Sequence, residues 1–104
     1  PSAPDRPQPQ FATQAAIDLD QIEEYVSQDS PQAARRLVQR LREVCFTLAE
    51  QPYMRYARPE FGSSHRSFIV PGTLYFIIYR PVDAGVEIIH VRQGSQNFSR
   101  LFEQ

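Results

Sequence analysis

Apolar residues recur at helical spacing in the first half of the chain and at strand-like spacing in the second. Residues 13–26 and 31–51 carry an apolar side chain every three or four positions, the period of one face of an α-helix. The first stripe is Ala15, Leu19, Ile22 and Val26, and the second is Ala34, Leu37, Leu41, Val44, Cys45 and Leu48. The pattern predicts two helices, and the short link between them allows only an antiparallel hairpin.

Polar residues and prolines predict where these helices begin and end. Thr13 is placed to cap the first helix, and Ser30 followed by Pro31 is a start signal for the second. Pro52 ends the second helix. The face of the first helix opposite its stripe is acidic, and we expect it to contact solvent or a partner. It carries Asp18, Asp20, Glu23 and Glu24.

The period changes after residue 62, and residues 66–70, 74–80 and 86–92 read as three strands joined by short turns. Pro71 and Gly72 form the first turn. The middle segment, LYFIIYR, is apolar at both parities, which is typical of a central strand covered on both faces. The three strands predict an antiparallel meander, followed by a short terminal helix over residues 95–102.

The first ten residues, PSAPDRPQPQ, hold 4 of the 9 prolines and read as a flexible tail. A strand just before Phe11 can lie only at a sheet edge, because Pro7 and Pro9 have no amide donor. Residues 11–104 then form one α+β domain with a helical hairpin packed on the sheet. We expect its core to include Leu19, Ile22, Leu37, Leu41, Leu48, Phe76 and Ile78.

Composition narrows the class of protein. The chain has 104 residues, 41% of them hydrophobic, and no apolar run near the roughly 20 residues that cross a bilayer. We therefore expect no membrane partner and no secretion. The lone cysteine, Cys45, fits helix packing in a reducing cytoplasm, and we expect neither a metal site nor another cofactor.

The formal net charge of -1 argues against general or sequence-specific nucleic acid binding through many phosphate contacts. The charge is unevenly distributed, however. Residues 13–51 carry 7 acidic and 4 basic side chains, whereas residues 52–104 carry 4 acidic and 6 basic ones. All 11 basic residues are arginine, so no lysine is available for chemistry.

The order of these elements resembles that of toxins of the RelE and ParE type from bacterial toxin–antitoxin pairs. Three groups of residues carry the resemblance, which covers roughly residues 11–102. They are the first helix signature (Ala15, Asp18, Leu19, Ile22, Tyr25, Val26), the second helix (Ser30, Pro31, Ala34, Leu37, Leu41, Leu48, Pro52), and the sheet region (Arg58, Pro59, Glu60, Phe61, Arg66, Ser67, Phe68, Tyr79, Arg80, Val86, Ile88, Val91, Gly94).

The resemblance implies one of two activities. The RelE branch consists of ribonucleases that cut messenger RNA on the ribosome, and the ParE branch is associated with poisoning DNA gyrase. The detailed pattern is more similar to ParE. RNA cleavage would need a base, an acid and a cation, for which Glu60 or His90, His65, and Arg66 or Arg92 are the candidates. After the last strand, however, Gln93, Gln96 and Asn97 exchange no protons near neutral pH.

The resemblance therefore predicts a binding-type gyrase poison with no catalytic residue, held in a hetero-oligomer with a ParD-like antitoxin. The expected target-binding residues are Arg66, Arg80, Arg92, Gln96 and Arg100. The expected antitoxin-binding residues are Leu19, Tyr25, Leu37, Leu41, Phe98 and Phe102. Arg66 has a structural alternative, an ion pair with Glu60 or Glu87. A non-toxic peptide-binding module is the third reading of the whole chain.

Overall fold

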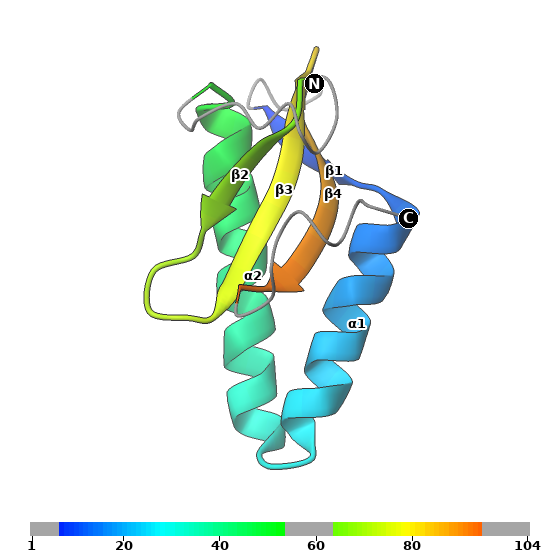
Figure 1. Cartoon of the computed structure of the whole chain (residues 1–104), viewed down its shortest axis with the longest axis vertical. Coiled ribbons are helices and arrows are strands. Elements are labelled where there is room, and N and C mark those ends of the chain that lie inside the picture. Colours follow the sequence, from blue (N-terminus) through cyan, green and yellow to red (C-terminus); the bar gives the residue numbers. More distant parts are fainter. Residues whose placement is uncertain (1–6, 54–63, 95–104) are drawn as a thin grey trace, which may run out of the picture.

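The computed structural model describes residues 7–53 and 64–94, and these form an α+β fold. Two helices lie side by side against one face of a four-stranded sheet (Figure 1). In chain order the elements are β1 (Gln8–Phe11), α1 (Thr13–Ser27), α2 (Pro31–Glu50), β2 (Arg66–Ile69), β3 (Tyr75–Val82) and β4 (Gly85–Gln93). This arrangement confirms the predicted fold class, the helical hairpin and the meander.

The sheet has the strand order β1-β4-β3-β2, so β1 and β2 form its edges. β2, β3 and β4 pair antiparallel, whereas β1 pairs parallel to β4. The predicted edge strand is therefore confirmed, and it contains Pro9, whose missing amide donor is tolerated at an edge. The sheet is mixed and begins at Gln8, within the proline-rich segment that the sequence predicted to be a tail.

One helix start agrees with prediction and one does not. The Ser30 hydroxyl accepts a hydrogen bond from the Ala33 amide at 3.1 Å, with Pro31 in the first turn. Thr13 is not the cap of α1. Ala12 occupies that position, and its amide donates to the Ile88 carbonyl at 2.9 Å. This bond extends the contact between β1 and β4 by one residue, and the helix begins one residue earlier than the sequence indicated.

The core lies between the helical hairpin and the sheet, with α1 packed on β4 and α2 on β1 and β4. Of the seven residues expected to be buried, Leu19, Leu41 and Leu48 are fully buried in this core, and Ile22 and Leu37 are partly buried against it. Phe76 and Ile78 are fully buried as well, but they lie on the parity of β3 that points away from the helices. Cys45 is fully buried, as its place in the stripe predicted. Burial raises the pKa of its thiol to about 12 despite the nearby Arg42, so it remains a packing residue without nucleophilic character.

Gly85 makes the parallel pairing of β1 possible. It has a φ of +142°, and a Cβ at this position would lie 2.3 Å from the backbone oxygen of Gln8. Any side chain here must push β1 away from β4. The contact explains why this turn requires glycine.

We expect Gly85→Ala to separate β1 from β4 and to lower the free energy of unfolding by roughly 1–3 kcal/mol or more. Urea denaturation measures the change. Gly72→Ala is the matched control, because Gly72 also has a positive φ, of +78°, but has open space around its Cβ position. An equal loss in both variants would contradict the steric role assigned to Gln8.

No helix in residues 7–53 or 64–94 is long and apolar enough to cross a membrane. The predicted terminal helix over residues 95–102 lies outside the described residues. So do Glu60, Gln96, Phe98, Arg100 and Phe102.

Candidate functional site

The sheet register separates the three described arginines that were expected to bind the target. Arg66 lies opposite Tyr79, which belongs to the core beneath the helices, so Arg66 is on the helix side of the sheet. Arg80 and Arg92 are paired with Glu87 and Phe76, on the parity that points away from the helices. The expected group of arginines therefore does not form one surface.

The surroundings of Arg66 explain its position. Its guanidinium lies over the ring of Tyr53, 5.0 Å from the centroid, at the end of the helical hairpin. The ion pair with Glu87 that the sequence left open for Arg66 is instead made by Arg80, whose Nε lies 2.7 Å from Glu87 Oε1. Arg80 is thus held by a cross-strand partner, with its side chain 43% exposed.

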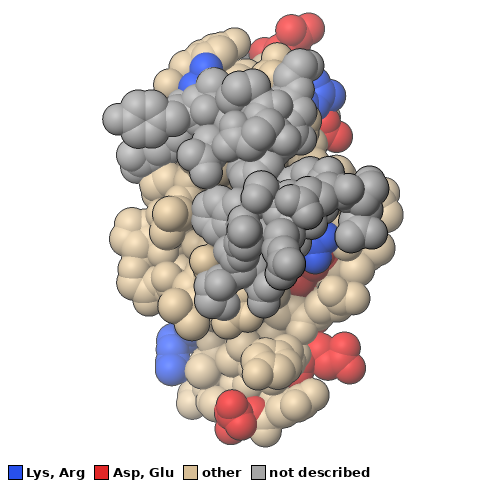
Figure 2. Space-filling view, viewed as in Figure 1, with Lys and Arg blue, Asp and Glu red and all other residues tan. Residues whose placement is uncertain are grey.

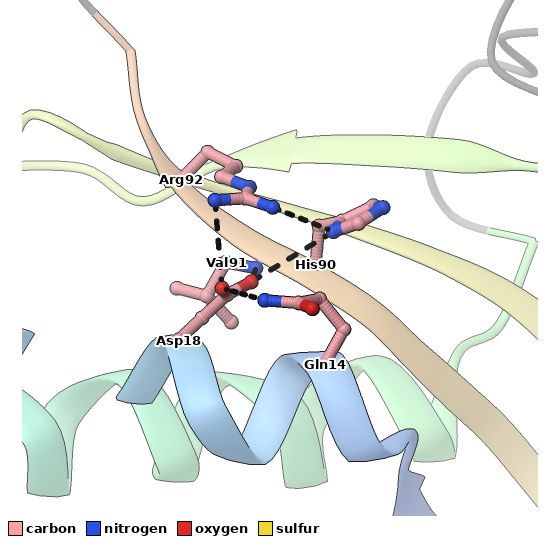
Figure 3. A network of polar contacts seen from close by, with 5 residues as sticks. All are labelled: Gln14, Asp18, His90, Val91 and Arg92. Carbon is pink, nitrogen blue, oxygen red and sulfur yellow. Dashed lines mark hydrogen bonds and ion pairs between the residues drawn. The ribbon is translucent and has the colours of Figure 1, made fainter. Parts of the chain in front are cut away.

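Arg92 belongs to a polar network centred on Asp18 (Figure 3). Asp18 Oδ1 accepts a hydrogen bond from Gln14 Nε2 at 2.9 Å and lies 3.5 Å from Arg92 Nη1. Asp18 Oδ2 accepts from the Val91 amide at 3.0 Å and lies 3.8 Å from His90 Nδ1. The network joins α1 to the C-terminal end of β4.

Asp18 is only 2% exposed, so the prediction that it faces solvent or a partner was wrong. The sequence held the missed signal. Asp18 is three residues after Ala15 and four before Ile22, which places it on the apolar stripe itself. A charged residue at a core-facing position needs a partner, and here the partners come from β4. The other carboxylates of that predicted face are half-buried or exposed.

The Asp18 carboxylate is ionised at neutral pH. Burial by itself raises the pKa of Asp18. The contacts with His90, the Val91 amide, Gln14 and Arg92 outweigh it, and the net pKa lies below the usual 3.8. The ionised carboxylate of Asp18 therefore faces the guanidinium of Arg92.

His90 Nδ1 can serve only one of its two neighbours at a time. It lies 3.3 Å from Arg92 Nη2, from which it could only accept, and 3.8 Å from Asp18 Oδ2, to which it could only donate. His90 is therefore engaged within the network, while His65 precedes β2, on the other side of β3.

A cleft of about 240 Å³ opens next to this network, between α1 and the ends of β3 and β4. Ile22 and Tyr25 line it from the helix, and Tyr75 and Arg92 line it from the sheet. Tyr25 is 70% exposed. Burial, and then the nearby Tyr25, raises the pKa of Tyr75. The cleft thus offers aromatic surface beside an arginine.

The described residues that were expected to bind an antitoxin differ in how far they are exposed. Tyr25 is on the surface and Leu37 is partly buried, but Leu19 and Leu41 are 1% and 0% exposed. In this structure Leu19 and Leu41 present no surface to a partner. Several other apolar side chains are exposed on the described surface, among them Ile17, Phe46, Ile69 and Leu74.

On the face shown in Figure 2, the described basic side chains lie apart from one another and form no continuous patch. Within residues 7–53 and 64–94, no three His, Cys, Asp or Glu side chains gather as a metal site. The site is a buried polar network with an adjoining cleft on a small α+β scaffold.

Comparison with known proteins agrees with that class. The fold is similar to a solved structure described as the chromosomal ParDE TA system from P. aeruginosa, with a TM-score of 0.70 and 21% identity. The match covers 86% of this chain and 98% of that one. The chain is also 34% identical over 83 residues to a protein named "Putative toxin Y4kP" from Sinorhizobium fredii (strain NBRC 101917 / NGR234). That match covers 80% of this chain and 83% of the relative.

The sequence profile of the family described as "ParE toxin of type II toxin-antitoxin system, parDE" matches residues 10–98. The chain belongs to this family of ParE toxins. The predicted resemblance to ParE-type toxins is thereby confirmed.

Proposed function

We propose that this protein is a toxin that inhibits DNA gyrase by binding it and that a cognate antitoxin neutralises it. The observation that carries the proposal is the match of the ParE toxin family over residues 10–98, which span all the described strands and helices except the first two residues of β1. The ParE branch is the one associated with gyrase. Gyrase and an antitoxin would both be met in the cytoplasm.

The chemistry of the site supports binding over catalysis. Asp18 and Arg92 keep their charges at neutral pH, and the one described histidine in the site, His90, has Nδ1 within 3.3 Å of Arg92. Target affinity must then come from contacts, for which an arginine offers a planar set of donors to phosphate or carboxylate groups. Arg92 and Arg80 are the described candidates on the outer face, and Gln96 and Arg100 extend the proposed surface beyond the described residues.

The cleft beside Arg92 supports the proposal of an antitoxin partner. It combines the exposed ring of Tyr25 with Ile22 and Tyr75, a surface that suits an apolar side chain of an amphipathic segment. Because Arg92 lines the same cleft, an antitoxin seated there would cover a proposed target-binding residue. Neutralisation would follow from occlusion, in a hetero-oligomer of toxin and antitoxin.

Purified protein tests the proposal directly. We expect it to trap cleaved DNA when mixed with gyrase, ATP and supercoiled plasmid, and we expect no cleavage of messenger RNA on translating ribosomes. Adding the product of the adjacent gene should reverse the trapping. Ribosome-dependent RNA cleavage without gyrase inhibition would replace this proposal with the RelE-type activity. A protein that neither inhibits gyrase nor cleaves RNA would favour the peptide-binding module.

A further inference from the structure

The β4 strand has an open edge where β1 ends. β1 pairs with β4 only from Gly85 to Ile88, and Ala12 makes the last backbone bond to Ile88. Beyond this point no strand in the described structure borders β4 on that side. The Val91 amide instead donates to Asp18 Oδ2 at 3.0 Å, so a carboxylate from α1 takes the place of a neighbouring strand (Figure 3).

This position immobilises the Asp18 carboxylate. Each of its oxygens accepts a hydrogen bond, one from the Val91 amide and one from Gln14 Nε2, and the side chain is almost completely buried. A buried carboxylate held at two points acts as a fixed negative charge. It is aimed at the edge of β4, where the side chains of the two flanking residues, His90 and Arg92, reach it.

Arg92 is oriented by this charge. Its side chain leaves β4 on the face away from the helices and returns to the strand edge, where Nη1 lies 3.5 Å from Asp18 Oδ1. Nη2 lies 3.3 Å from His90 Nδ1. One third of the Arg92 side chain remains exposed, while its Nε atom is buried and makes no hydrogen bond.

We propose that Asp18 is a positioning residue for Arg92, which sets the direction in which the guanidinium meets the toxin's target. The inference rests on the proposed function, because it assigns to Arg92 a contact with that target. Asp18 itself touches no target in this scheme. Asp18 affects target binding only by orienting Arg92. A general contribution to folding would instead act whether or not Arg92 is present.

Asp18→Asn is the informative variant. Asparagine has the size of aspartate, and its carbonyl oxygen still accepts a hydrogen bond from the Val91 amide, but the negative charge that faces Arg92 is lost. Asp20→Asn is the matched control, because Asp20 lies on the same helix and is exposed. We expect Asp18→Asn to weaken gyrase trapping about 5- to 10-fold and Asp20→Asn to leave it unchanged.

A double-mutant cycle with Arg92→Gln tests the dependence. If Asp18 acts through Arg92, adding Asp18→Asn to Arg92→Gln should cause no further loss of trapping. An equal loss in both backgrounds would overturn the inference and leave Asp18 as a folding residue. Full trapping by Arg92→Gln would overturn it as well, because Arg92 would then not be the contact through which Asp18 acts.

A second measurement does not depend on gyrase. The ¹⁵N relaxation of Arg92 Nε should report an ordered side chain in the wild type and in Asp20→Asn, and a mobile one in Asp18→Asn. Unchanged order in Asp18→Asn would overturn the positioning role even if gyrase is not the target. Failure of wild-type protein to trap gyrase, together with a mobile Arg92 in Asp18→Asn, would refute the proposed function and retain the positioning role.

Discussion

We expect expression of this protein in a bacterial host to arrest growth, and replacing Arg92 by glutamine to remove most of that arrest. Arg92 is the described arginine that combines a place on the outer sheet face with contacts that orient it and a partly exposed side chain. A hydrogen bond between charged groups contributes about 1.5–3 kcal/mol, so its loss should weaken target binding roughly 10- to 100-fold. The measurement is the growth rate after induction, at matched levels of protein.

Two controls accompany this variant. Arg36→Gln removes the same charge from an exposed position on α2 and should leave the arrest intact. His65→Gln removes a candidate acid for RNA cleavage and should also leave it intact. Because Arg92 contacts the buried Asp18, circular dichroism and thermal denaturation must show that the variant is folded. Arrest that survives Arg92→Gln but is lost in His65→Gln would favour a ribonuclease.

Replacing Leu41 by alanine should lower the free energy of unfolding by about 2–5 kcal/mol. Leu41 is 0% exposed, in the core between the hairpin and the sheet, and its truncation leaves a cavity that the surrounding side chains fill only in part. A domain of this size has about 5–15 kcal/mol of stability in total. Thermal or urea denaturation of the isolated protein measures the loss.

Phe46→Ala is the control for this second experiment, since Phe46 lies on the same helix and is 47% exposed. We expect a loss below about 1 kcal/mol for it, close to the range of surface substitutions. The comparison also bears on the residues expected to contact the antitoxin. A Leu41→Ala protein with unchanged stability but weakened antitoxin binding would contradict its burial and return Leu41 to the partner surface.

The sequence by itself determined the elements and their order. Local signals were sufficient for this, because they depend on neighbours within a few residues. The apolar stripes predicted both helices, Ser30 and Pro31 marked a helix start, and the turn at Pro71 marked the meander. The prolines before Phe11 restricted any strand there to an edge, and the structure places β1 at the edge. The ordered set of motifs was also enough to indicate the ParE family, which the family match confirms.

The tertiary structure decided which side chains meet. Arg66 and Arg80 resemble each other as strand arginines, but they lie on opposite faces of the sheet, because the pairing of β2 with β3 places Arg66 opposite Tyr79, the neighbour of Arg80. Ala12, and not Thr13, caps α1. Its amide bonds to Ile88 at the end of the parallel pairing between β1 and β4, which are more than seventy residues apart in the sequence. The burial of Asp18 also depends on contacts between distant segments. β1 stops at Phe11 and leaves the edge of β4 beyond it open, and the packing of α1 against that edge gives the carboxylate its partners.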